Sequence, residues 1–133
     1  MAQKLKLLII DDASFIRDLV KKAIRSQLSA IEVFEAQDGK KAQAMLKAHH
    51  FDILLCDWEM PEMSGLELLQ WIREQPKFAK LPFMMVTSRG DKSHVVKAVE
   101  AGVNDYIGKP FTNDQLMQKL TKLIYKFYKI KPA

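Results

Sequence analysis

The sequence predicts an α/β fold in which five helices cover an open, doubly wound parallel sheet of five strands. Short apolar runs alternate five times with longer segments of helical periodicity, and three of these runs are nearly continuously apolar, as strands covered on both faces are. With 133 residues, 48% of them hydrophobic, the chain has enough material for one core but not comfortably for two. We therefore expect residues 1–133 to form a single domain with right-handed crossovers between strands.

Each expected strand is a short apolar run bounded by polar or turn-forming residues. In order along the chain, the runs are LKLLII (5–10), IEVFEA (31–36), FDILLC (51–56), LPFMMV (81–86) and NDYIG (104–108). In a doubly wound sheet, the carboxyl ends of such strands line the crevice in which ligands bind. The residues that directly follow the strands are therefore the first candidates for chemistry.

The segments between the runs carry apolar residues three or four positions apart, the spacing of a helix with one buried face. The expected helices are 14–28, 39–49, 64–74, 91–101 and 113–129. The stripes that we expect to face the core include Leu19 in the first helix and Val95, Val96 and Val99 in the fourth.

Several of these helices begin or end at recognisable signals. Ser64, followed by Glu67 three positions later, matches a capping box at the start of a helix. Gly102 is suited to the left-handed position just past a helix end. These signals support the helix boundaries that the periodicity predicts.

Composition excludes several classes of protein. No apolar run approaches the roughly 20 residues of a membrane-spanning helix, and the start of the chain lacks the apolar core and cleavage site of a secretion signal. The single cysteine, Cys56, cannot form an internal disulfide, and its place in an apolar run predicts a buried, reduced thiol. We therefore expect a cytoplasmic protein that is not associated with a membrane.

The positive charge is concentrated near the end of the chain. From Lys109 onward there are six lysines and one acidic residue, so this segment carries the whole net charge of +5. Lys119, Lys122, Lys126 and Lys129 are three or four positions apart and share one helix face. Such a basic face is expected either to bind an acidic segment of a protein partner or to be exposed to solvent without a partner. Nucleic acid is the least expected partner, because no aromatic or recognition-helix pattern accompanies the charge.

Reactive polar residues follow four of the five expected strands. They are Asp11 and Asp12 after the first strand, Asp57 after the third, Thr87 and Ser88 after the fourth, and Lys109 after the fifth. If these four strands are neighbours, three carboxylates, a hydroxyl and an ammonium group converge on one crevice. Ordinary loop polarity alone is a poor explanation for so many reactive groups at equivalent strand ends.

A divalent cation explains why two aspartates stand side by side at the end of a buried strand. Neighbouring carboxylates disfavour joint ionisation, but a bound Mg²⁺, which prefers carboxylate, carbonyl and water oxygens, removes this conflict. Together with Lys109, the ion would neutralise phosphoryl oxygens, while Thr87 would donate a hydrogen bond to one of them. Because Asp11 and Asp12 form the pair, Asp57 is the better candidate for a nucleophile that forms an aspartyl phosphate.

With these residues in view, the chain resembles the receiver domain of two-component response regulators. The stretches LLIIDDAS (7–14), DILLCDWEMPEMSGLELL (52–69), LPFMMVTS (81–88) and AGVNDYIGKPF (101–111) match the pattern of that family in order and spacing. The resemblance covers residues 4 to about 128 and is closest in kind to CheY-like, chemotaxis-type stand-alone members. It implies a flavodoxin-like three-layer sandwich with strand order 2-1-3-4-5.

The resemblance implies a metal-dependent phosphorylation site. Asp57 matches the phosphoacceptor, which takes a phosphoryl group from a histidine kinase or a small phosphodonor. Asp12 matches a direct ligand of Mg²⁺ (or Mn²⁺), and Asp11 matches an acid that holds the ion largely through water. Asp57 and the backbone carbonyl of Glu59 match the remaining protein ligands.

The resemblance also implies a conformational switch. Thr87 and Lys109 match the pair that senses the phosphoryl group, Tyr106 matches the aromatic switch residue, and the Lys109–Pro110 bond is expected to be cis. The surface formed by helix 91–101, strand 104–108 and helix 113–129 would then bind a downstream protein. Such a protein is a monomeric regulator rather than an enzyme, since its only reactions are self-catalysed phosphotransfer and autodephosphorylation.

Glu59, two positions after Asp57, differs from the small amide familiar in chemotaxis members. Arg89 stands two positions after Thr87, across the same crevice. Their opposite charges predict an ion pair that acts as a gate, restricting attack by water on the phosphoryl group. The alternative is two exposed side chains whose pairing contributes less than about 1 kcal/mol.

Other functions remain alternatives at this stage. A phosphatase of the haloacid-dehalogenase type also uses Asp, Thr and Lys around Mg²⁺, but its metal-binding acids would stand elsewhere in the chain. The sequence also fits a receiver domain cut from a longer multidomain regulator, or a receiver-like interaction module that never takes phosphate. A flavin carrier is disfavoured, because the anionic stretch DDASF would repel the flavin phosphate.

Overall fold

The structure is a computed structural model in which residues 4–131 are described. Its five strands form one parallel sheet in the order β2-β1-β3-β4-β5, which confirms the expected fold class and strand order. The strands are β1 (Leu5–Ile10), β2 (Ile31–Ala36), β3 (Ile53–Asp57), β4 (Phe83–Thr87) and β5 (Asp105–Gly108). The helices are α1 (Ser14–Gln27), α2 (Gly39–Ala48), α3 (Gly65–Glu74), α4 (Lys92–Glu100), α5 (Asn113–Tyr128) and a short 3-10 helix, η1 (Pro76–Phe78).

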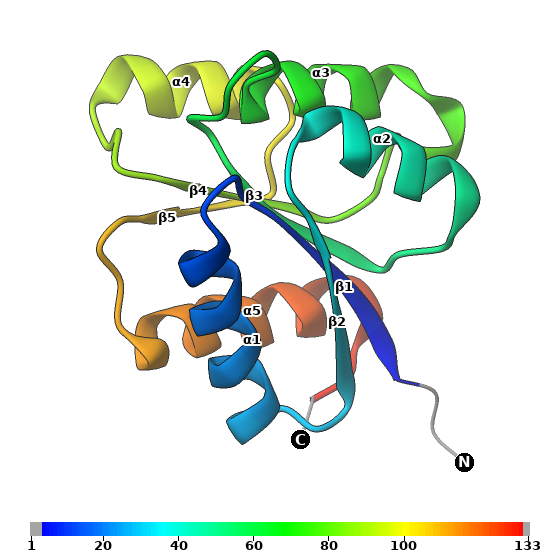
Figure 1. Ribbon diagram of the computed structural model, residues 1–133, viewed down its shortest axis with the longest axis vertical. Coiled ribbons are helices and arrows are strands. Elements are labelled where there is room, and N and C mark those ends of the chain that lie inside the picture. Colours follow the sequence, from blue (N-terminus) through cyan, green and yellow to red (C-terminus); the bar gives the residue numbers. More distant parts are fainter. Residues whose placement is uncertain (1–3, 132–133) are drawn as a thin grey trace.

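The helices cover both faces of the sheet. Helices α1 and α5 lie on one face, and α2, α3 and α4 lie on the other (Figure 1). Alternate residues of β1 divide between the two cores, so that Leu7 and Ile9 pack with α1 and α5 while Leu8 and Ile10 pack on the opposite side. Because both faces are buried, the central strands have the continuous apolar sequences from which the sheet was predicted.

Two strands extend further toward their carboxyl ends than the sequence predicted. Strand β3 ends at Asp57 and β4 ends at Thr87, one residue later than expected in each case. The reason is that the parallel pairing continues to the end of the buried strands, where Asp57 pairs with Val86. The two polar residues are therefore fixed by the sheet itself rather than by the loops that follow it.

The helix signals read from the sequence form the expected structures. The Ser64 hydroxyl accepts a hydrogen bond from the Glu67 backbone N–H at 3.1 Å, and the Glu67 carboxylate accepts one from the Ser64 N–H at 3.0 Å. Gly102, two residues after α4, has a φ of +96°, a left-handed conformation that glycine adopts without strain.

Two of the predicted apolar stripes are partly wrong. Leu19 in α1 is 48% exposed, and in α4 Val96 and Val99 are 42% and 64% exposed. Helix α4 is only nine residues long and meets the core through Ala98, its single fully buried residue. The valines around Ala98 therefore point largely to solvent, which periodicity alone does not reveal.

Near the amino end of the sheet, the Arg73 side chain connects three segments of the chain. From α3, its guanidinium donates hydrogen bonds to the backbone carbonyls of Leu81 at 2.7 Å and Gly102 at 2.9 Å, and to the side chain of Asn104 at 2.8 Å. The same Asn104 oxygen accepts a hydrogen bond from the backbone N–H of Phe83, the first residue of β4. This network fixes the starts of β4 and β5 relative to α3.

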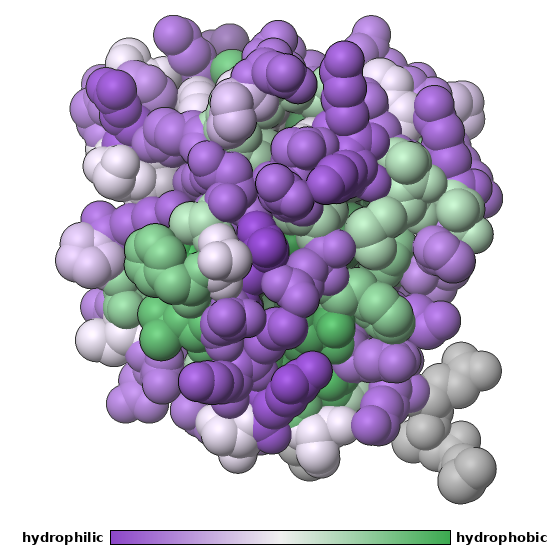
Figure 2. Space-filling model, viewed as in Figure 1, coloured by the Kyte–Doolittle hydropathy of each residue, from purple (hydrophilic) through white to green (hydrophobic). Residues whose placement is uncertain are grey.

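The surface is mostly hydrophilic in the view of Figure 2, and hydrophobic side chains appear there only as small separate patches. Within residues 4–131, no helix combines the length and the apolar character that a membrane-spanning segment needs.

Candidate functional site

The carboxyl end of the sheet gathers the polar residues that the sequence singled out. Asp11 directly follows β1, Asp57 ends β3, Thr87 ends β4 and Lys109 directly follows β5. Among residues 4–131, the buried polar side chains are those of Asp11, Asp57 and Thr87, which are 1%, 4% and 0% exposed. Burying carboxylates is unfavourable unless they are paired, so their presence at one crevice marks a site built for charge.

Lys109 bridges the two buried carboxylates. Its Nζ lies 3.1 Å from Asp57 Oδ1 and 3.3 Å from Asp11 Oδ2. Burial by itself would lower the pKa of Lys109, but the hydrogen bond to Asp57 and the charge of Asp11 outweigh it and raise the pKa. The side chain is therefore an ammonium ion, held between residues that are 98 and 52 positions away in the chain.

Ionisation of the Asp57 carboxyl is disfavoured in this crevice. Burial, and then the nearby charge of Asp11, raise its pKa to about 6, against the opposing effect of Lys109. A carboxylate in this position gains from any additional positive charge. A cation bound beside Asp57 would therefore favour its ionised form.

The arrangement of oxygens fits a hard divalent cation. One carboxylate oxygen from each of Asp11, Asp12 and Asp57 lies within 4.8 Å of the other two, and Asp12 is exposed while its two partners are buried. Asp11 is held in place by a hydrogen bond from the Ala13 N–H to its Oδ1 at 2.9 Å. Three converging carboxylates with one open side suit Mg²⁺, which keeps several water ligands. The metal role of the Glu59 backbone carbonyl stays a prediction.

Thr87 is linked to Glu59, which the sequence did not predict. The Thr87 hydroxyl lies 2.8 and 3.0 Å from the two carboxylate oxygens of Glu59, and the Ser88 hydroxyl lies 3.2 Å from one of them. Loop geometry decides this contact, so sequence spacing offered no signal for it.

The expected ion pair between Glu59 and Arg89 does not form. Among the ion pairs of residues 4–131, none joins these two side chains. The Glu59 carboxylate is turned instead toward the hydroxyls at the end of β4, where two neutral donors satisfy it. The predicted gate is therefore wrong as a contact between these two charges.

A chain of hydrogen bonds runs from Thr87 to the outer surface. The backbone N–H of Arg89 donates to Thr87 Oγ1 at 2.9 Å, and the hydroxyl of Tyr106 donates to the backbone carbonyl of Arg89. Tyr106, in β5, is half-buried. The Lys109–Pro110 peptide bond is cis, as the resemblance implied.

Gly65 has a role at the site that sequence reasoning missed. A Cβ atom at this position would lie 2.3 Å from the backbone carbonyl oxygen of Asp57, closer than any real contact. The N–H of Gly65 also donates to the Trp58 carbonyl at 2.8 Å, which holds the loop against the start of α3. The available signal was a glycine at the first position of a capped helix, where no turn requires one.

Trp58 and His94 pack together beside the site. Trp58, the neighbour of Asp57, is 8% exposed, and its ring centroid lies 5.0 Å from that of His94. His94, in α4, is half-buried.

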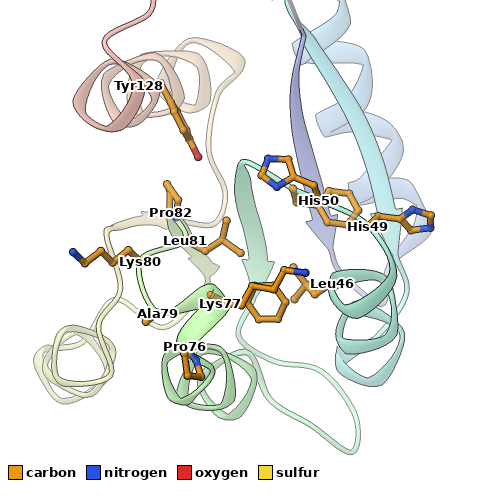
Figure 3. A pocket seen from close by; sticks show the side chains of 12 residues that line it. Leu46, His49, His50, Pro76, Lys77, Ala79, Lys80, Leu81, Pro82 and Tyr128 are labelled. Atoms are coloured by element: carbon orange, nitrogen blue, oxygen red, sulfur yellow. The ribbon is translucent and has the colours of Figure 1, made fainter.

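A separate cavity lies at the opposite, amino end of the sheet. It has a volume of about 420 Å³, and its lining includes Leu46, Phe51, Leu81 and Tyr128 (Figure 3). None of the carboxylates of the crevice contributes to it. The crevice, rather than this cavity, therefore holds the chemistry that the sequence predicted.

Comparisons with known proteins agree with this geometry. The family model of the response regulator receiver domain matches residues 7–121 of this chain. A chemotaxis protein CheY homolog of Campylobacter jejuni is 41% identical over 121 residues, covering 90% of this chain and 92% of that protein. The chemotaxis protein CheY of Pseudomonas aeruginosa is 40% identical over 119 residues, covering 90% of this chain and 95% of that protein.

Solved structures show the same likeness. The chemotaxis protein CheY4 of Vibrio cholerae superposes with a TM-score of 0.84 at 28% identity, covering 90% of this chain and 98% of the other. A putative response regulator from Chloroflexus aurantiacus gives a TM-score of 0.85 at 30% identity, covering 92% of this chain and 98% of the other.

Proposed function

We propose a function from a premise that the comparisons establish: this chain belongs to the response regulator receiver family and is CheY-like. We propose that it is a signalling switch controlled by phosphorylation of Asp57. CheY-like receivers are signalling regulators of two-component systems. The observation that carries the proposal is the buried Asp57 carboxylate, 3.1 Å from the Lys109 ammonium and within reach of two further acids.

In the proposed reaction, an Asp57 oxygen attacks the phosphorus of a phosphohistidine on a histidine kinase. An O–P bond forms while the N–P bond breaks, and the electron pair of that bond returns to the imidazole. Asp57 must be ionised for this step, and Lys109 supports the ionised form and would neutralise a phosphoryl oxygen. A Mg²⁺ or Mn²⁺ ion held by Asp11, Asp12, Asp57 and the Glu59 carbonyl would add positive charge for the same oxygens.

The phosphoryl group would then alter the surface around β5. Thr87, the last residue of β4, would turn its hydroxyl toward the phosphoryl group and release the backbone of Arg89. Tyr106, which donates to the Arg89 carbonyl, would respond to that movement. The switch would thereby reach the surface formed by α4, β5 and α5.

We propose that this α4–β5–α5 surface binds a protein partner. It carries the exposed Val96 and Val99 on α4 and the lysines of α5, so it suits a partner segment with apolar and acidic side chains. Because the relatives compared above are chemotaxis proteins, a chemotaxis-type pathway is the proposed setting.

The experiment that tests the proposed reaction is intact mass spectrometry after incubation with Mg²⁺ and acetyl phosphate. We expect the wild-type protein to gain one phosphoryl group, and the Asp57→Ala variant to gain none. The exposed Asp18→Ala variant is the matched control and should react like wild type. Equal mass gain in Asp57→Ala would refute the proposal, and continuous release of phosphate from phosphomonoesters would favour the phosphatase alternative.

A further inference from the structure

Glu59 occupies the single hydrogen-bond donor of the Thr87 side chain. A threonine hydroxyl carries a single proton, and the nearest acceptors of that proton are the two Glu59 oxygens at 2.8 and 3.0 Å. Oγ1 accepts at the same time from the Arg89 N–H at 2.9 Å, so the hydroxyl is held from both sides. A hydrogen bond to an ionised carboxylate is stronger than one to a neutral acceptor.

We propose that Glu59 is a latch that competes with the phosphoryl group for the Thr87 hydroxyl. This inference rests on the proposed function, in which Thr87 donates to a phosphoryl group on Asp57. Because one proton cannot serve both acceptors, the hydroxyl must leave Glu59 before it can engage the phosphoryl group. The latch therefore favours the unphosphorylated arrangement by the strength of the Glu59–Thr87 contact.

The position of Glu59 allows the latch to open. Glu59 as a whole is exposed, whereas Thr87 is fully buried, so the carboxylate can turn into water after it releases the hydroxyl. Ser88, which also contacts Glu59, is exposed as well. Opening the latch thus transfers a charged group to solvent without leaving a buried charge unpaired.

The latch also bears on the switch residue. While Glu59 holds Thr87, the Arg89 backbone is fixed through its N–H, and the Tyr106 hydroxyl contacts the carbonyl of the same residue. The Glu59 side chain is in this sense a positioning group, because it acts through Thr87, whereas the proposed metal role of this residue belongs to its backbone carbonyl, which a side-chain substitution retains. Its effect replaces that of the expected Glu59–Arg89 pair.

A competing explanation is that Glu59 acts only through its negative charge, which would repel any anion bound at Asp57. The two explanations differ in their dependence on the Thr87 hydroxyl. Removing the hydroxyl abolishes a latch but leaves charge repulsion unchanged, so a double-mutant cycle between Glu59→Ala and Thr87→Val separates them.

The test measures the affinity of beryllofluoride, a tetrahedral mimic of the phosphoryl group, in saturating Mg²⁺ by ¹⁹F NMR. We expect Glu59→Ala to bind beryllofluoride about tenfold more tightly than wild type, because the unbound state loses a charge-assisted hydrogen bond. Glu59→Gln retains a weaker, neutral acceptor, so its affinity for beryllofluoride should lie between those of wild type and Glu59→Ala. The control Glu62→Gln removes a charge from the same loop and should change the affinity by no more than about twofold.

When Thr87 is already replaced by Val, we expect the further Glu59→Ala substitution to change the affinity for beryllofluoride no more than the Glu62→Gln control does. An equal gain from Glu59→Ala with and without the Thr87 hydroxyl would overturn the latch and leave charge repulsion as the cause. If Glu59→Ala alone, with Thr87 intact, bound beryllofluoride no more tightly than wild type, the latch would be overturned too. Failure of wild type and all variants to bind beryllofluoride would instead count against the proposed function.

Discussion

Lys109 at the carboxyl end of the sheet and Arg73 near its amino end are both half-buried cations, but their partners differ. Lys109 lies between two carboxylates, whereas Arg73 donates only to backbone carbonyls and to the Asn104 amide oxygen, and no ion pair of residues 4–131 involves it. Burial accordingly lowers the pKa of Arg73, while the carboxylates raise that of Lys109.

The difference separates a structural network from a reactive one. Around Arg73, every strong donor meets a neutral acceptor, so the network is complete in the folded protein and has no need of a ligand. Around Lys109, two buried carboxylates share one cation while the exposed Asp12 adds a third negative charge beside them, and a bound metal ion would correct this imbalance. Substitutions at the two ends should therefore have different consequences.

The largest expected effect on stability is at Arg73. Arg73→Ala leaves several carbonyls at the starts of β4 and β5 without their donor, and we expect a loss of about 4 kcal/mol in the free energy of unfolding, measured with urea. The exposed Arg25→Ala is the matched control and should cost less than about 0.5 kcal/mol. If Arg73→Ala were as mild as the control, the network would not be structural.

A slightly smaller effect, but at the reactive end, is expected for Gly65→Ala. The added Cβ would meet the Asp57 carbonyl oxygen at 2.3 Å, so the loop after β3 must shift, at a cost of about 3 kcal/mol. We expect the rate of reaction with acetyl phosphate to fall as well. Gly90→Ala, where a Cβ has no atom within 4 Å, is the control and should leave both quantities near their wild-type values.

Asp57→Asn is expected to stabilise the protein, in contrast to the loss of stability expected for Arg73→Ala. The pKa of Asp57 is raised from 3.8 to about 6, so ionising it costs folding free energy as the pH rises through that interval. In metal-free buffer at pH 7.5, we expect the free energy of unfolding of Asp57→Asn to exceed that of wild type by about 1–3 kcal/mol. At pH 4, we expect the two free energies of unfolding to be nearly equal.

Adding Mg²⁺ should stabilise wild type more than Asp57→Asn and so narrow that gap. Equal stability of the two proteins at pH 7.5 without metal would show that the Asp57 carboxylate carries no electrostatic penalty, contrary to the account of the crevice given above.

The smallest expected effect is at Tyr128, whose hydroxyl donates to the Asp52 carbonyl at 2.5 Å beside the cavity at the amino end. Tyr128→Phe removes this hydrogen bond but keeps the packed ring, and should lower the unfolding free energy by about 1 kcal/mol. Its reaction with acetyl phosphate should match wild type. A slower reaction would mean that the two ends of the sheet are coupled.

The sequence predicted the parts of this molecule that depend on local pattern. Strand runs, helix periods and the Ser64 capping box are short-range features, and each appears within a few residues of its expected place. The clustering of Asp11, Asp57 and Lys109 followed from one topological rule about strand ends. The family resemblance added the strand order and the cis bond before Pro110, both of which the structure confirms.

What the sequence could not predict depends on how loops and short helices pack. The exposure of Val99 follows from the way α4 meets the sheet through Ala98. The Glu59–Thr87 contact depends on the conformation of the loop after β3, and opposite charge wrongly favoured Arg89 as the partner. The Arg73 network joins segments up to 31 positions apart, and no spacing rule anticipates it.

The central claim, that Asp57 is the nucleophile at a crevice of several acids, is tested most directly by locating the acyl phosphate. The protein would be treated with acetyl phosphate and Mg²⁺, reduced with borohydride, and digested, so that a phosphorylated aspartate is converted to homoserine and mapped by tandem mass spectrometry. We expect homoserine at position 57 alone, and none without Mg²⁺. Homoserine at position 11 or 12 instead of 57 would contradict the account.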